Sequence, residues 1–353
     1  MSSFVKKINT APQLYKSHKG VKTFPNQQYG VSSGTPSLDA VLPGNALPLG
    51  TLCVLYEDTF SRHYVHLHKS YLGEGIVNEH KCLVIDPDTF ASKDDWLKLL
   101  PAVYKVSSST PSEAASTSTT SSDGGLKVAW RYNNLLVEES KTTGGAGSRL
   151  EYRFDNSREM GNAFANSMSH QLCKEDYTVH LKYDSELQSL NDLWERVVEA
   201  VQNNLESEND DRIFRILLPN FHMILGQKGS EALRVQEVVK FLRNFKALLR
   251  SLNGVCLLSV DEDLLPKALI PQLTFTADLV LKLTSFKDHQ ELTIGDYDGT
   301  LKLVKQPRLH GLLSGLSDFD IYALRLKGKT GMVVERIHME PEVDRAGQDE
   351  NLQ

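Results

Sequence analysis

Eight residues that follow an apolar run occupy the position of a phosphate-binding loop, but they lack the residues that bind phosphate. Such a loop reads Gly-x-x-x-x-Gly-Lys-[Ser/Thr]; its glycines let backbone N–H groups surround the phosphates, and its lysine contacts the terminal ones. The corresponding residues of this chain are Glu57, Asp58, Thr59, Phe60, Ser61, Arg62, His63 and Tyr64. Both glycines are replaced, His63 stands in place of the lysine, and the phenol of Tyr64 stands in place of the magnesium-binding hydroxyl.

The charges of this segment also disfavour a nucleotide. The carboxylates of Glu57 and Asp58 would repel a triphosphate unless a metal ion intervened, and residues other than glycine have a steric cost at the positive φ angles of an anion nest. Arg62 and His63 could contact a phosphate, although Arg62 could equally pair with one of the two carboxylates. We therefore expect the isolated chain to have no catalytic residues and no cofactor of its own.

The segments that precede these residues predict how they are positioned. Residues 34–42 carry a Gly-x-x-Ser-Leu-Asp helix start, residues 47–50 a Leu-Pro-x-Gly turn, and residues 51–56 an apolar run typical of a buried strand. RecA-like ATPases have the same order of parts before their phosphate-binding loop. We expect residues 65–72 to form the helix after the degenerate loop, and the two glycines at positions 73 and 75 to end it.

The second signature of such an ATPase is also missing. It requires an aspartate at the end of a hydrophobic strand, where the carboxylate binds magnesium through water. The best candidate strand, residues 212–218, ends in Pro219 and Asn220, and Asp211 lies at its wrong end. The simultaneous loss of phosphate-binding and metal-binding residues indicates a lost site rather than a misaligned one.

Composition limits the remaining functions. The chain has 353 residues, of which 40% are hydrophobic, a net charge of -6 and a pI near 6.0. These values predict a real core and disfavour unaided nucleic-acid binding, although a local basic channel stays possible. We expect no signal peptide and no membrane helix, because no apolar run approaches the required length of about 20 residues. The cysteines have no metal-ligand spacing and are expected to be unpaired thiols of a reducing compartment: Cys53, Cys82, Cys173 and Cys256.

The chain is organised as one interrupted α/β unit. Residues 1–28 are expected to be a flexible N-terminal extension, and residues 29–340 a single domain. A Ser/Thr/Gly-rich insertion at about residues 107–148 should be disordered, because such a composition cannot bury enough apolar area. Residues 341–353 are predicted to be a loose acidic tail.

Alternating strands and helices predict a mostly parallel, twisted sheet that is flanked by helices. The expected buried strands are residues 81–86, 212–218 and 255–260. One helix is expected to start at residues 184–185, and a second helix is expected to cover residues 230–252. Later strands alternate in polarity and are separated by glycine turns: residues 277–283, 299–304, 321–326 and 332–337. This pattern predicts antiparallel edge strands at the C-terminal side of the sheet.

No other segment has a catalytic pattern, but one helix carries candidate nucleic-acid contacts. Basic residues span the predicted helix opposite its apolar stripe: Arg234, Lys240, Arg243, Lys246 and Arg250. They form a solvated face or a subunit contact in one interpretation, and contact phosphates in the other. His63 and His66 could share a helix face, but we predict no metal site.

The chain resembles the PAXNEB family, the fourth subunits of the Elongator complex. The resemblance covers residues 29–341; its more specific parts are the Trp-Arg-Tyr element at residues 130–132 and the final strand, while the opening frame is common among RecA-like proteins. It implies a cytoplasmic and nuclear RecA-like subunit that forms a heterohexameric ring with Elongator proteins 5 and 6. It also implies that the ring binds tRNA and supports the wobble-uridine (U34) modification that another Elongator subunit performs, with any ATP held at ring interfaces.

Two functions of other classes remain open at this point. The first is a RecA-like recombinase ATPase acting on DNA, which the missing lysine and aspartate disfavour. The second is a scaffold protein with no RNA role, which tRNA binding by a reconstituted ring would exclude.

Overall fold

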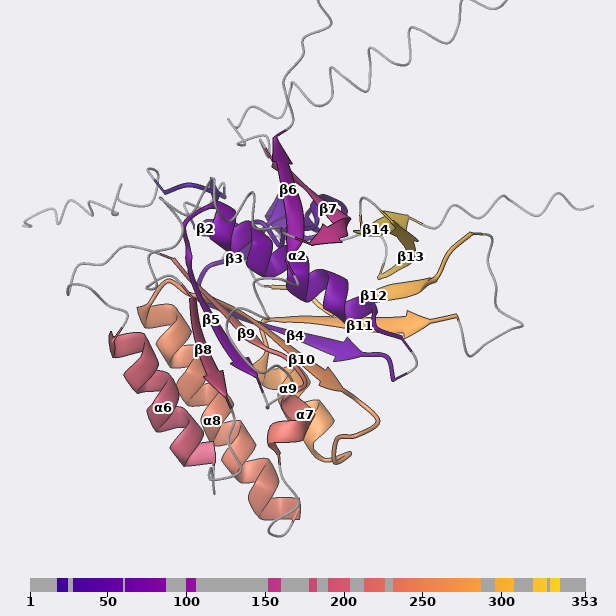
Figure 1. Cartoon of the computed structure of the whole chain (residues 1–353). Helices are drawn as coiled ribbons and strands as arrows, with labels where there is room; N and C mark the ends of the chain where they lie inside the picture. Colours follow the sequence, from indigo (N-terminus) through magenta and orange to yellow (C-terminus); the bar gives the residue numbers. More distant parts are fainter. Residues whose placement is uncertain are drawn as a thin grey trace, which may run out of the picture. The chain divides into compact units, whose positions relative to one another are not determined.

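The structure is a computed structural model of the chain (Figure 1). It describes residues 18–24, 28–59, 61–86, 100–105, 152–159, 178–182, 190–203, 213–225, 231–286, 296–307, 320–328 and 331–336. The chain divides into two compact units, one made of residues 1–103 and 154–353 and the other of residues 104–153. The 107–148 insertion, the Trp-Arg-Tyr element and the acidic tail lie outside the described residues, as do residues 1–17 of the predicted N-terminal extension, and those expectations stay predictions. Residues 18–24 of that extension are described, and Val21–Thr23 form strand β1.

A nine-stranded sheet forms the centre of the first unit, in the order β14-β13-β12-β11-β4-β10-β9-β5-β8. Six neighbouring strands are parallel: β4 (Thr51–Glu57), β5 (Lys81–Asp86), β8 (Thr178–Lys182), β9 (Phe214–Leu218), β10 (Val255–Asp261) and β11 (Leu279–Ser285). Three C-terminal strands continue the sheet in antiparallel pairing: β12 (Gly299–Lys305), β13 (Ile321–Lys327) and β14 (Gly331–Arg336). The predicted RecA-like α/β fold, with a mostly parallel sheet and antiparallel edge strands, is confirmed.

The direction of β11 corrects one detail of the prediction. This strand was expected among the antiparallel edge strands because its sequence alternates. It does pair in antiparallel with β12, but it also pairs in parallel with β4 and so belongs to the parallel core. Val280 packs in the helix-covered core, whereas Lys282 further along the same face is half-exposed and contacts Glu262. The polar and apolar residues of β11 therefore alternate because helices cover only part of one face of this strand. Such an alternation does not depend on whether the strand is parallel or antiparallel.

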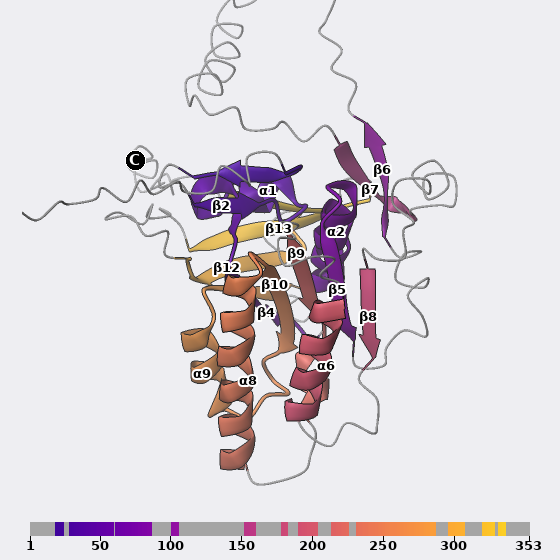
Figure 2. The same ribbon diagram turned by 90° about the vertical axis from the view of Figure 1, so that its left-hand side faces the viewer.

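Helices cover both faces of the parallel strands (Figures 1 and 2). Helix α2 (His63–Val77) packs on the face that bears Cys53 and Leu55 of β4. Three helices pack on the face that bears Leu52 and Val54: α6 (Leu190–Asn203), α8 (Glu231–Ser251) and α9 (Leu269–Thr276). Successive residues of a strand point to opposite faces, so one apolar run supplies both cores; a short helix, α7 (Phe221–Ile224), follows β9.

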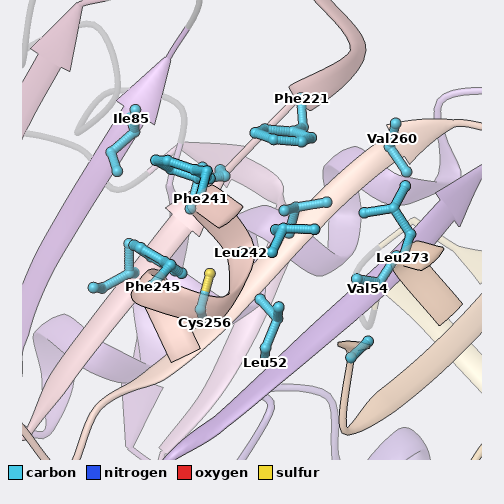
Figure 3. Packing of buried hydrophobic residues seen from close by; sticks show 14 of the residues in the cluster. Leu52, Val54, Ile85, Phe221, Phe241, Leu242, Phe245, Cys256, Val260 and Leu273 are labelled. Carbon is cyan, nitrogen blue, oxygen red and sulfur yellow. The ribbon is translucent and has the colours of Figure 1, made fainter. Parts of the chain in front are cut away.

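The core between the sheet and α8 is built around aromatic side chains (Figure 3). The rings of Phe241 and Phe245 stack with centroids 5.7 Å apart, and Phe221 stacks on Phe241 at 6.0 Å. All three are buried, together with Leu242, which directly follows Phe241. This packing fixes α8, whose opposite side then faces outward.

The predicted frame before the degenerate loop is present. Strands β1 (Val21–Thr23), β2 (Tyr29–Val31) and β3 (Leu47–Pro48) form a small antiparallel sheet, and helix α1 (Pro36–Asp39) and a 3-10 helix (Pro43–Asn45) lie between β2 and β3. Asp39 is buried, and its carboxylate accepts a hydrogen bond of 2.8 Å from the backbone N–H of Ser33. The Ser-Leu-Asp pattern is thus a helix start that also fixes the strand before it.

Other expected boundaries shift by a few residues or lie outside the described part. Helix α6 is described from Leu190, so the predicted start at residues 184–185 is not covered. Strand β6 (Pro101–Lys105) begins at Pro101. Strand β6 forms a two-stranded sheet with β7 (Tyr152–Glu159).

Helix α2 is longer than the sequence predicts at both ends. It starts at His63 instead of residue 65 and continues through Gly73 and Gly75 to Val77. A Cβ atom on Gly75 would lie 2.5 Å from the sulfur of Cys82 and 2.7 Å from Cδ of Arg215. The glycine therefore permits close packing of the helix on the sheet and does not end the helix.

We expect Gly75→Ala to lower the free energy of unfolding by about 1–3 kcal/mol, the usual cost of overpacking a buried site. Alanine in a helix is more favourable than glycine by roughly 1 kcal/mol. A net loss of stability in Gly75→Ala would therefore show that the packing cost exceeds this gain. Urea denaturation of the variant measures this loss. Gly73→Ala is the matched control, because its Cβ would meet its nearest neighbour, in Phe154, at 3.0 Å. Equal or higher stability of Gly75→Ala would contradict the packing argument.

Candidate functional site

The degenerate loop lies where a phosphate-binding loop lies, between a central parallel strand and the helix that follows it. Glu57 is the last residue of β4, and His63 and Tyr64 are the first residues of α2. Asp58, Thr59, Ser61 and Arg62 lie between them, while Phe60 is outside the described residues. The structure thus brings the described loop residues together at the carboxyl end of the sheet, as the sequence indicates.

Side chains of the loop bind the ends of neighbouring strands. The hydroxyl of Thr59 donates hydrogen bonds of 3.0 and 3.2 Å to the carboxylate of Asp261, at the end of β10, and one of 3.2 Å to Asp263. The carboxylate of Asp58 accepts a hydrogen bond from the backbone N–H of Ser285, at the end of β11. These bonds hold the loop to the sheet from both sides, so the two side chains serve the protein's own structure.

Two buried carboxylates end adjacent parallel strands beside the loop. Glu57 and Asp261 are register partners on adjacent parallel strands, and their side chains are 7% and 6% exposed. Burial, with a smaller contribution from Asp261, raises the pKa of Glu57 to about 7, although Ser259 and the backbone N–H of Asn220 donate hydrogen bonds that oppose this shift. The Oε1 atom of Glu57 has no hydrogen-bond partner. A buried acid of this kind disfavours an anion.

The first turns of α2 supply no strong compensating charge. His63 is buried, Arg62 is exposed, and burial with the nearby Glu57 raises the pKa of the Tyr64 phenol. Burial lowers the pKa of His68 to about 3, against a small opposing effect of Asp86, so its imidazole is neutral at physiological pH. The residues present do not fit the phosphates of a nucleotide.

Strand ends carry carboxylates that the sequence analysis missed. The end of β9 has none, as expected, because Pro219 and a left-handed Asn220 follow Leu218. Buried aspartates instead end the strands on either side of β9, Asp261 on β10 and Asp86 on β5. The signal was the acidic residue that directly follows each apolar run. Within the described part of the chain no group of three metal-ligating residues is placed to hold a metal ion.

Comparison with known proteins decides the family. A family model described as PAXNEB protein matches residues 14–353, nearly the whole chain. The chain belongs to the PAXNEB family. Elongator complex protein 4 of Xenopus laevis is 28% identical and aligns over 90% of this chain and 81% of its own length. The human protein of that name is also 28% identical, over 90% and 78%, and the Drosophila melanogaster one is 23% identical, over 97% and 94%.

The fold of this PAXNEB protein is also similar to that of a solved structure. A KaiC-like protein from Pyrococcus horikoshii covers 86% of this chain and 98% of its own, with 12% identity and a TM-score of 0.46. In addition, no described helix of the PAXNEB protein is long and apolar enough to cross a membrane.

The structure separates the five basic residues that the sequence placed on one helix face. Lys246 is used internally: its Nζ lies 2.6 Å from Oδ1 of Asp278 and donates to the carbonyl of Thr276. Arg234 lines a cavity beside α7, Arg250 is exposed beside Gly50, and Lys240 and Arg243 share a second cavity. Lys240 and Arg243 are thus two of the five that line one cavity together.

Arg215 is a structural residue whose role the sequence did not reveal. This fully buried side chain of β9 donates from Nε to Nδ1 of His80 at 2.9 Å. Its NH1 donates to the carbonyl oxygens of Ser32, at 2.9 Å, and Tyr71, at 3.2 Å, and the guanidinium lies over the Tyr71 ring. Burial raises the pKa of the Glu74 carboxyl, and the positive charge of Arg215 opposes part of this rise. A lone arginine inside an apolar strand was the available signal.

Proposed function

We propose that this PAXNEB protein is the fourth subunit of the Elongator complex and has no catalytic activity of its own. The relatives that align with this chain over most of their length are named Elongator complex protein 4. The proposal that the subunit is non-catalytic rests on one observation. Glu57 and Asp261, which are register partners on adjacent strands, place two buried carboxylates at the position of the phosphate-binding loop. These carboxylates are incompatible with a triphosphate bound by this loop alone.

The proposal extends to a heterohexameric ring with Elongator proteins 5 and 6. A RecA-like subunit can retain its loop for contacts with a neighbour after the catalytic residues are lost. The ring would bind tRNA and support wobble-uridine modification by the catalytic part of Elongator, in the cytoplasm and nucleus. With a net charge of -6, this chain would supply a few phosphate contacts to a channel that several subunits line. Any ATP would be held at a subunit interface.

Reconstitution tests the assembly directly. Co-expression of the three proteins, followed by measurement of the mass in solution, is expected to give a stoichiometric complex of six chains. A complex that forms but binds no tRNA would favour the scaffold function. DNA-stimulated ATP hydrolysis by this chain alone would favour the recombinase function. Either result would overturn the proposal.

The isolated chain is expected to bind no ATP at micromolar affinity and to hydrolyse none, because its loop offers a buried acid pair in place of a phosphate cradle. Calorimetric titration with Mg-ATP and a turnover assay on the purified monomer measure both. His63→Ala is the informative variant, since His63 occupies the lysine position. Micromolar binding that this substitution abolishes would contradict the interpretation of the loop as degenerate.

A further inference from the structure

A groove runs between α8 and α9, which lie side by side (Figure 2). Its volume is about 430 Å³. The side chains that line it come mainly from α8, with one from α9: Val235, Gln236, Val239, Lys240, Arg243, Asn244 and Gln272.

The charge of this groove has one sign. Lys240 and Arg243 are exposed and lie three residues apart, which places them on the same side of the helix. Nζ of Lys240 has only a long contact of 3.4 Å with the amide oxygen of Asn191. The described lining residues include no carboxylate, but Glu237, three residues before Lys240, is exposed on the same side of α8. On a chain with a net charge of -6, this is a local positive surface.

The groove combines two apolar side chains, Val235 and Val239, with basic and amide groups, and its two positive charges favour a nucleic-acid backbone over a protein partner. Gln236, Asn244 and Gln272 carry amides, which both donate to phosphate oxygens and bond sugar hydroxyls. Protein interfaces are enriched in aromatic residues, methionine and arginine and depleted in lysine; the described lining of this groove contains Lys240 and Arg243 but no aromatic residue and no methionine. The cavity beside α7 differs: Met223 and Leu264, which line it, are 55% and 62% exposed.

We propose that the α8–α9 groove binds the phosphodiester backbone of RNA, with Lys240 and Arg243 contacting adjacent phosphates. Arg250, two helical turns beyond Arg243 on the exposed side of α8, extends the positive surface. These contacts carry no base information, because the basic and amide groups that line the groove suit phosphate or sugar. This inference rests on the proposed function, since it assigns part of the ring's tRNA contact to this subunit.

The test uses the three-subunit assembly and the double variant Lys240→Gln/Arg243→Gln. We expect tRNA affinity at 150 mM salt to fall about tenfold, and the slope of log K against log salt to become shallower by about 1.4–1.8, the effect of two lost phosphate contacts. The matched control, Lys302→Gln/Arg336→Gln, removes the same charge from exposed positions on β12 and β14 and should stay within about twofold of wild type. Mass in solution and thermal melting are recorded for each assembly.

The outcomes separate this inference from the proposed function. Wild-type tRNA affinity and salt slope in the groove variant, in an assembly that binds tRNA, would overturn the groove assignment alone. Equal losses in the groove and control variants would overturn it as well, because they would reflect net charge only. A groove variant that no longer assembles would show that the groove contacts an acidic surface of a neighbouring subunit. Absence of tRNA binding by the wild-type assembly would overturn both proposals.

Discussion

Replacing Arg215 by methionine is expected to lower the free energy of unfolding by about 3–5 kcal/mol, the range observed when one partner of a buried charge pair is removed. Methionine keeps most of the apolar length of the side chain but leaves Nδ1 of His80 and the carbonyl oxygens of Ser32 and Tyr71 without their donor. Each orphaned buried group costs about 1–3 kcal/mol. Glu74 loses a nearby positive charge as well.

Urea denaturation of Arg215→Met and of Arg243→Met measures this effect against a matched control. Arg243 is exposed on α8, so its replacement should change stability by less than about 0.5 kcal/mol. In a double-mutant cycle, Glu74→Gln should destabilise the Arg215→Met protein less than it destabilises wild type. A loss below about 1 kcal/mol for Arg215→Met would show that the network is not needed for stability.

Glu57→Gln is expected to stabilise the protein at pH 8 and to have little effect below pH 4.5. The pKa of Glu57 rises from an ordinary 4.5 to about 7, chiefly through burial. The folded state therefore binds this proton more tightly than the unfolded chain, and the resulting stability is fully present below pH 4.5 and is lost as the pH rises through about 7. At pH 8 the ionised buried carboxylate costs about 1–3 kcal/mol, which glutamine removes.

Denaturation curves of wild type and Glu57→Gln at pH 5 and pH 8 test this expectation. The stability difference between the two proteins should be larger at pH 8, and should favour the variant there. Glu237→Gln serves as the control, because it removes an exposed carboxylate and should leave stability nearly unchanged at both pH values. A variant that is less stable than wild type at pH 8 would mean that the Glu57 carboxylate makes a favourable contact in its ionised form.

Local patterns predicted the parts of this fold that depend on neighbours in sequence. The apolar run of β4, the Ser-Leu-Asp helix start and the loss of phosphate-binding residues were all readable in this way. The extension of α2 through Gly75 was not, because it depends on Cys82 and Arg215, which lie on other strands. Tertiary packing overrode the usual preference of glycine for helix ends.

The contacts of the candidate site could not be predicted for the same reason. Thr59 bonds to Asp261 and Asp58 to Ser285, across separations of more than 200 residues. No spacing in the sequence indicates that these carboxylates and hydroxyls meet. The expectation that this loop binds no nucleotide stays a prediction. It depends on which residue types are missing, and that information is local.

A tRNA titration at physiological salt, with the isolated chain and the three-subunit assembly compared side by side, tests the proposed function most directly. Binding that is built from a few phosphate contacts on each of several subunits should be weak for one subunit and strong for the assembly, and should fall steeply as salt is raised. The account predicts at least a hundredfold higher affinity for the assembly, the gain expected when linked sites bind together. A monomeric isolated chain that binds tRNA as tightly as the assembly would contradict it.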